Sequence, residues 1–295
     1  VLSGLCAWLL ADTLVTVYRK VLPVVGSVLF LPTALFWSSG LLKETLSTAL
    51  LFMLIHYLLR IVKKNESYPS SYLKIVLALA VLAMLKYYYA AVAGPMIISM
   101  LIIYHLEKRI LLRRRFAVLG FTGIVLLMGL GGSLLHPNLN PGRLPNVIVN
   151  NHDLYISSSR ENNTIHFREL EPTWSRIGAN IPIALLSGLY RPFPSERGNL
   201  FKRIIGVGNL FLLILTVPAL RQKWPTDKLD SVLLLGGILY ILIEATFISL
   251  STPNFGTLSR YKTGYIPLFL YLILLRHPVV GWLSNRLSKV KWINQ

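Results

Sequence analysis

The feature that most constrains this chain is a series of apolar stretches, each about 15 to 20 residues long and carrying few charges. A helix of that length crosses the roughly 30 Å of hydrocarbon in a bilayer. Nine such ranges can be drawn, at 2–18, 22–39, 45–62, 72–90, 94–106, 116–135, 203–220, 231–250 and 262–276. Apolar residues make up 54% of the chain and charged residues only 14%, which excludes an ordinary soluble domain. We therefore expect an all-α fold, a polytopic transmembrane helix bundle with about nine spans.

Basic residues gather in alternate connections between these ranges. They are Arg19 and Lys20; Arg60, Lys63, Lys64 and Lys74; Lys108, Arg109, Arg113, Arg114 and Arg115; Arg221, Lys223 and Lys228; and Arg276, Arg286, Lys289 and Lys291. Connections rich in lysine and arginine stay on the cytoplasmic side of a membrane. The pattern predicts a multi-pass protein surrounded by membrane lipids, with Val1 outside and Gln295 in the cytoplasm.

The formal net charge of +18 raises the question of nucleic-acid binding. The basic residues lie between hydrophobic segments and not on one soluble face with interleaved aromatic residues, so we expect no nucleic-acid partner. The sequence contains no P-loop, GxGxxG or HExxH pattern, and Cys6 is its only cysteine. We therefore expect neither a metal site nor a cofactor.

The connection at residues 136–202 is far longer than the others and falls on the predicted outer side. It divides the chain into an N-terminal transmembrane bundle (1–135), an extracytoplasmic loop (136–202), and a C-terminal transmembrane segment with a basic cytoplasmic tail (203–295). Within the loop, Ile177 to Tyr190 is apolar but too short to span. This stretch predicts a re-entrant or interfacial helix that ends at Pro192 and Pro194.

Two further expectations concern boundaries. The pair Gly94-Pro95 predicts a tight turn between the fourth and fifth apolar ranges, because proline disfavours helix in the residue before it. Val1 enters apolar sequence at once, without a charged n-region or a cleavage site. We therefore expect further residues upstream.

Charged side chains inside hydrocarbon are costly and mark a pathway, a site or a buried ion pair. Asp12, Lys86 and Glu244 fall inside predicted spans, and Lys43 and Glu44 lie at the outer mouth of the third. We expect Lys86 and Glu244 to form an ion pair, because an unpaired charge at that depth is penalised. In the structural alternative, Lys86 extends outwards past the neighbouring tyrosines and Lys43-Glu44 only begins a helix.

On the outer side, Arg191 and Arg260 each adjoin a membrane entry, and each has a neighbouring tyrosine, Tyr190 or Tyr261. Guanidinium presents a planar fork that binds phosphate oxygens in pairs. These residues predict a site for a diphosphate headgroup in the outer leaflet, with anchoring to lipid phosphates as the alternative. His152, beside an aspartate, offers a general base, with a solvated loop histidine as the alternative.

Three motif segments carry a family resemblance. They are PTALFWSSGLLKE at 32–44, LYRPFPSE at 189–196, and NFGTLSRYK at 254–262, which leads to Pro267. These segments resemble motifs of bacterial envelope-polysaccharide membrane proteins, namely O-antigen and exopolysaccharide polymerases and related lipid-linked-sugar glycosyltransferases. The resemblance implies sugar transfer at the outer face of the bacterial plasma membrane, from an undecaprenyl-diphosphate-linked glycan and without a metal or nucleotide sugar. Polymerase and glycosyltransferase both stay open.

The leading hypothesis is thus an enzyme that joins glycan units on lipid carriers. Its expected substrate-binding residues are Trp37, Lys43, Lys86, Tyr190, Arg191, Arg260, Tyr261 and Lys262. Lys43, Arg191 and Arg260 would neutralise the diphosphate, and the aromatic residues would stack on sugar rings. Glu44, His152 and Glu196 are the candidate bases. Two alternatives stay open: a transporter or flippase whose path is lined by intramembrane charges, and a non-catalytic subunit of a larger assembly.

Overall fold

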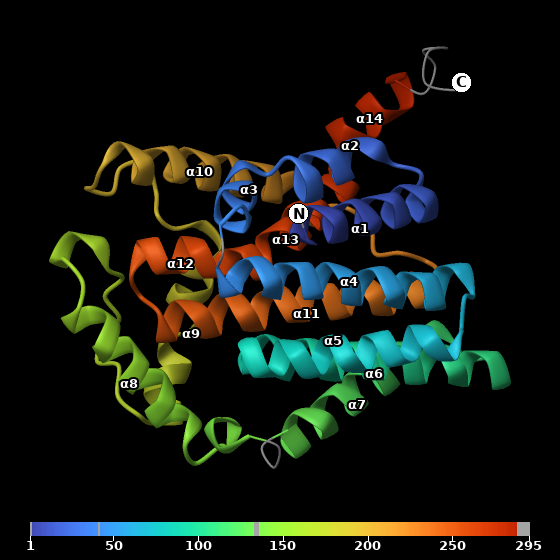
Figure 1. Cartoon of the computed structure of the whole chain (residues 1–295), viewed down its shortest axis with the longest axis horizontal. Helices are drawn as coiled ribbons and strands as arrows, with labels where there is room; N and C mark the ends of the chain where they lie inside the picture. The colour runs from blue at the N-terminus through green and yellow to red at the C-terminus, as the bar shows by residue number, and fades with distance from the viewer. Residues whose placement is uncertain (1, 41, 133–135, 288–295) are drawn as a thin grey trace.

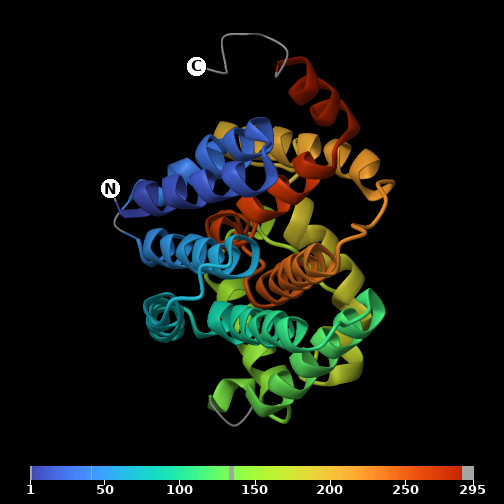
Figure 2. The same ribbon diagram turned by 90° about the vertical axis from the view of Figure 1, so that its right-hand side faces the viewer.

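The computed structural model describes residues 2–40, 42–132 and 136–287, and most of these residues are helical. Figures 1 and 2 show a bundle whose longest helices run roughly along one direction. The described residues form no β-strand, and one isolated bridge pairs Thr164 with Asn254. The expected all-helical class is confirmed.

The helices follow one another along the whole described chain. The first half contains α1 (Leu2–Tyr18), α2 (Val21–Val24), η1 (Val25–Leu29), α3 (Pro32–Ser38), α4 (Lys43–Lys64), α5 (Pro69–Leu85), α6 (Tyr87–Arg109) and α7 (Arg114–Gly132). The long connection contains η2 (Pro137–Leu139), α8 (Leu144–Ser157), η3 (Glu161–Asn163) and α9 (Trp174–Tyr190). The last part contains α10 (Leu200–Leu220), α11 (Lys228–Ser251), α12 (Phe255–Tyr261), η4 (Lys262–Gly264), α13 (Ile266–Arg276) and α14 (Pro278–Leu287).

Five of the described helices are long and apolar enough to cross a membrane, namely α4, α6, α7, α10 and α11. Two bent pairs raise the number to seven if each pair forms one span. The chain bends by 42° between η1 and α3, and by 72° between α13 and α14. α1 and α5 are apolar but have only 17 residues each. The fold is therefore a helical bundle with five to seven candidate spans, and the expected nine are not established.

The boundary between α5 and α6 lies at Lys86, so the expected turn at Gly94-Pro95 is wrong. α6 runs without interruption from Tyr87 to Arg109 and contains Pro95. A helix packed among other helices tolerates the missing N–H of a proline. The chain instead breaks where Lys86 adopts φ −149° and ψ 79°, and its side chain meets Glu44 of α4.

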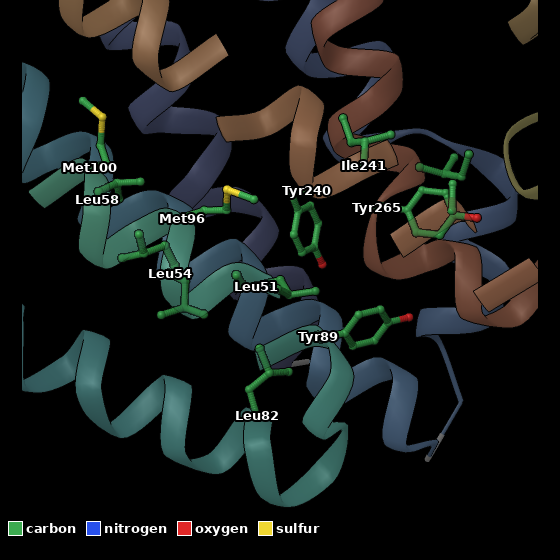
Figure 3. Packing of buried hydrophobic residues seen from close by; sticks show 14 of the residues in the cluster. Leu51, Leu54, Leu58, Leu82, Tyr89, Met96, Met100, Tyr240, Ile241 and Tyr265 are labelled. Atoms are coloured by element: carbon green, nitrogen blue, oxygen red, sulfur yellow. The ribbon is translucent and has the colours of Figure 1, made fainter. Parts of the chain in front are cut away.

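The core brings helices from the earlier and later parts of the sequence together around α11. Figure 3 shows Leu54 of α4, Met96 of α6, and Tyr240 of α11 within one cluster of buried side chains. α9 packs against α11 so closely that a Cβ at Gly188 would lie 2.1 Å from the carbonyl oxygen of Ala245. Only glycine fits at this contact.

The apolar stretch at 177–190 forms a helix, as expected. α9 begins after Thr173, whose side chain accepts a hydrogen bond from the backbone N–H of Arg176. Its N-terminal half is largely exposed, whereas its last turn is buried inside the bundle. Pro192 and Pro194 follow in the connection to α10. α9 is thus exposed at its start and buried at its end, and its placement as a re-entrant or interfacial helix stays a prediction.

The basic connections lie together at one end of the bundle, which we call the basic end (right in Figure 1). Lys20 donates to the carbonyl oxygen of Leu275 at 3.2 Å, and Lys63 pairs with Asp230 at 2.8 Å. Arg114 donates to the carbonyl oxygen of Pro225 at 2.9 Å. The opposite end, the loop end, holds α8, α12 and the start of α4. The connections that the sequence marks as basic thus lie at the same end of the bundle (Figure 1).

Candidate functional site

A buried carboxylate at the start of α4 organises the loop end. Glu44 is 4% exposed and lies in the first turn, after Leu42 in extended conformation. Its Oε1 forms an ion pair with the Nζ of Lys86 at 3.0 Å and lies 3.5 Å from the Nε of Arg260. One carboxylate therefore neutralises one of two neighbouring cations.

Lys86 is held by aromatic rings as well as by charge. It is 9% exposed, and its Nζ lies 3.7 Å from the ring centroid of Tyr261 and 5.6 Å from that of Tyr88. The face of an aromatic ring attracts a desolvated cation. The helix break at Lys86 directs the ammonium group toward these partners.

Tyr261 joins three elements at this site. Its carbonyl oxygen accepts a hydrogen bond from the Tyr89 hydroxyl at 2.5 Å, and its own hydroxyl lies 3.3 Å from that of Tyr155 on α8. The guanidinium of Arg260 lies 5.2 Å from its ring centroid. We call Glu44, Lys86, Tyr155, Arg260 and Tyr261 the Glu44 cluster.

The electrostatics of the Glu44 cluster favour negative charge. Burial opposes ionisation of the Tyr261 phenol, but its hydrogen bond with Tyr155 and the charges of Lys86 and Arg260 outweigh that effect and lower its pKa. An added anion would meet the same two cations. The arrangement is therefore suited to binding an anionic group.

A second group surrounds Phe255 at the start of α12. Arg191 pairs with Glu196 at 2.5 Å, and its guanidinium lies 5.0 Å from the Phe255 ring centroid. Lys202 of α10 lies 4.2 Å from the same centroid and donates to the carbonyl oxygens of Asn162 and Arg197. The Arg191 group, namely Arg191, Glu196, Lys202 and Phe255, shares α12 with the Glu44 cluster.

Lys262 links η4 to the end of α9 through hydrogen bonds, and its side chain does not face an open site. It is 4% exposed, and its Nζ donates to the carbonyl oxygens of Leu189 at 3.2 Å and Arg191 at 2.7 Å. Burial lowers its pKa to about 7, although Glu196 opposes this shift. Lys262 thus satisfies two carbonyl groups at the end of α9.

The remaining expected site residues lie in varied surroundings. Lys43 is exposed, and Trp37 is half-buried against Phe201 of α10, with ring centroids 6.3 Å apart. Tyr190 is buried against Phe269 of α13. Because its ring is packed in the core, Tyr190 has no open face for a sugar.

His152 belongs to α8, one helical turn before Tyr155. Its Nδ1 lies 2.9 Å from the Oδ1 of Asp153, and its ring lies 5.8 Å from that of Phe167. Residues three apart share a helix face, so His152 lies next to the Glu44 cluster along α8. Its contacts are with Asp153 and Phe167, so we do not count His152 in that cluster.

Glu244 does not pair with Lys86, so this expectation is wrong. Both carboxylate oxygens of Glu244 are buried, and neither has a hydrogen-bond partner among the described residues. Three nearby tyrosines, Tyr89, Tyr240 and Tyr265, donate their hydroxyls to backbone carbonyl oxygens instead. Lys86 meets Glu44 because the helix break turns it toward α4.

The three charges assigned to a transport path are separated. Asp12 is exposed on α1, Lys86 belongs to the Glu44 cluster, and Glu244 is enclosed in α11. In the described chain, no hydrogen bond or ion pair joins any two of them. In the same part of the chain, no three His, Cys, Asp or Glu side chains group in a way that would hold a metal ion.

The three motif segments meet at α12 and η4. The first and third are joined by Glu44 and Arg260, and the second and third by Lys262 and the carbonyl oxygen of Leu189. Asn209 of α10 donates to the carbonyl oxygen of Pro192 at 3.0 Å, which fixes the second segment from the other side. The first segment, which lies more than 140 residues before the other two in the sequence, thus forms one structural unit with them.

A scan against protein-family models and searches of curated proteins and of solved structures return no match for this chain.

Proposed function

We propose that this chain is a membrane enzyme that transfers or polymerises glycan units carried on a lipid diphosphate, with its site at the loop end. The observation that supports this proposal is the meeting of the three motif segments around α12. Their resemblance to envelope-polysaccharide polymerases and glycosyltransferases supplies the reaction class. The proposed location is the outer face of a bacterial plasma membrane.

In this mechanism the diphosphate of the donor binds Lys86 and Arg260. Both cations now face Glu44, so phosphate oxygens would replace its carboxylate. The exchange neutralises the charge that develops on the leaving diphosphate in a site of low dielectric constant. It also frees Glu44 from its ion pairs. Arg191, which is paired with Glu196, offers a second fork nearby.

The released Glu44 carboxylate is our choice for the general base. The acceptor hydroxyl oxygen forms a bond to the anomeric carbon while the bond from that carbon to the phosphate oxygen breaks. The acceptor proton passes to Glu44, and the lipid diphosphate leaves with the bonding electrons. Tyr261, half-buried beside both cations, offers a ring on which a sugar would stack.

The test is transfer from a lipid-linked donor in membranes that contain matched amounts of each variant. Arg260→Gln should lower the rate at least about tenfold, because the variant loses a charge-assisted contact to phosphate. Arg260→Lys should fall between the wild type and Arg260→Gln, because it keeps the charge and loses the fork. Arg143→Gln is the matched control, since Arg143 is exposed at the loop end. Wild-type transfer by both Arg260 variants would contradict the proposal.

A further inference from the structure

A cavity of about 360 Å³ lies inside the bundle, away from the Glu44 cluster. Its walls come from α1, α4, α6, α7, α11 and α13, and most of its lining is aliphatic, including Leu54, Met96 and Leu268. Figure 3 shows Leu54, Met96 and Tyr240 among the side chains around this space. The volume falls in the range of small-molecule binding sites.

The end of the cavity nearer the loop end is closed. The Tyr240 hydroxyl donates to the carbonyl oxygen of Gly264 at 3.1 Å, and both residues are buried. Tyr89 packs behind them so tightly that a Cβ at Gly264 would lie 2.4 Å from its ring. These side chains separate the cavity from the Glu44 cluster.

The other end lies at the basic end of the bundle. Its lining residues Lys20, Asp230 and Arg276 are only partly buried. Asp230 already pairs with Lys63 at 2.8 Å. Lys20 and Arg276 donate to backbone carbonyl oxygens, and neither has a carboxylate partner among the described residues. The rim of the cavity therefore carries positive charge that is not neutralised by an acidic side chain.

We propose that this cavity holds one aliphatic chain of an anionic lipid, whose phosphate lies between Lys20 and Arg276. An apolar cavity offers water too few hydrogen-bond partners and instead accepts apolar ligands. The cations at the rim complement a phosphate. A phospholipid and a polyprenyl phosphate share this chemistry. The site is independent of the proposed transfer reaction, because it opens at the opposite end of the bundle from the Glu44 cluster.

The test is lipid retention by the full chain in nanodiscs, followed by native mass spectrometry and thermal unfolding. The probes are dioleoylphosphatidylglycerol, undecaprenyl phosphate and, as the zwitterionic control, dioleoylphosphatidylcholine. We expect one anionic lipid per chain and a higher unfolding midpoint with that lipid than with phosphatidylcholine. Comparing the retention of the first two probes shows whether the bound aliphatic chain belongs to a phospholipid or to a polyprenyl phosphate. Equal retention of all three lipids, or of none, would overturn the proposal.

Two sets of variants locate the lipid. Ala93→Phe fills the cavity from α6, and its control Ala83→Phe adds the same ring on the exposed face of α5. Ala93→Phe should lower retention at least about tenfold, because the ring and the chain compete for one volume. Unchanged retention in a folded Ala93→Phe variant would overturn the site.

The second set tests the rim and does not alter the core. Lys20→Gln with Arg276→Gln should weaken retention of the anionic lipid about tenfold, because two charged contacts to phosphate are lost. Its control is Arg109→Gln with Arg113→Gln, which removes the same charge from exposed positions at the basic end. Equal losses of lipid retention in the two double variants would show that any positive charge at the basic end attracts the lipid. That result would overturn the assignment of the phosphate to Lys20 and Arg276.

Discussion

Glu44 is held between the ammonium group of Lys86 and the guanidinium of Arg260, in a place with little access to water. Removing one partner of a buried ion pair leaves an uncompensated charge, which typically costs about 3 to 5 kcal/mol. The two ion pairs join α4, the break at Lys86, and α12. They also set the charge of the proposed site.

We predict that Glu44→Gln destabilises the folded chain by about 3 kcal/mol, because it leaves the buried Lys86 ammonium without a carboxylate partner. Lys86→Met should cost less, because Glu44 keeps Arg260 at 3.5 Å. The double variant should be more stable than the sum of the two effects implies. The measurement is the unfolding midpoint of the four proteins in one detergent. Additive effects would contradict the ion pair.

Glu244 supplies the matched control for this cycle. It is a buried glutamate in α11 with no hydrogen-bond partner among the described residues. Glu244→Gln combined with Lys86→Met should therefore show a coupling energy near zero. Strong coupling there, with none for Glu44, would reverse the assignment and restore the pair expected from the sequence.

At the scale of elements, the apolar runs predict most of the long helices, because crossing hydrocarbon requires about 20 apolar residues. The range 22–39 is instead divided among α2, η1 and α3. The apolar runs were not enough to place the break at Lys86, because the apolar residues continue on both sides of it, and the Glu44 that Lys86 pairs with is 42 residues away in the sequence. Tyr155 was missed because α8 has no long apolar run to distinguish it. Its contact with Tyr261 arises only when α8 packs at the loop end.

The contact between α9 and η4 should make stability depend on pH through Lys262. Its folded pKa is lowered to about 7 by burial, whereas an exposed lysine titrates near 10.5. Between these values the unfolded chain binds more protons, so stability rises with pH, by at most about 1.4 kcal/mol per pH unit. Below pH 7 both states are protonated and this contribution is constant.

We predict that the unfolding midpoint of the wild type rises between pH 7 and pH 9 relative to that of Lys262→Met. The variant has no group at this position that titrates, so the difference in slope isolates Lys262. Thermal unfolding in a single detergent across that interval measures the effect. Equal slopes in the two proteins would show that Lys262 titrates normally.

At the scale of the whole molecule, the alternation of charge in the sequence predicted which connections lie together, because the same basic residues mark one side of a bundle. The three motif segments, which meet at α12 and η4, also indicate the region of the proposed site. The sequence did not reveal that Lys262 and Tyr190 are buried in packing contacts, because their roles follow from the tight contact of α9 with η4 and α13. Nor did it reveal the cavity, which depends on how six helices pack.

The two ends predict opposite accessibility across the membrane. A cysteine placed at Ser158 should react with an impermeant thiol reagent from outside. A cysteine placed at Gln222 should react only after the membrane is permeabilised. Both positions are exposed, and the native Cys6 is buried, which keeps the background low. The reverse pattern would place the loop end in the cytoplasm and contradict the proposed donor.

The most direct test of the central claim is the affinity of undecaprenyl diphosphate for the wild type, Glu44→Gln and Arg260→Gln, compared with transfer by the same proteins. Because Glu44 competes with phosphate for Lys86 and Arg260, Glu44→Gln should bind the diphosphate more tightly, by about tenfold, and yet fail to transfer. Arg260→Gln should lose both binding and transfer. Equal affinity in all three folded proteins would contradict a diphosphate site at the Glu44 cluster.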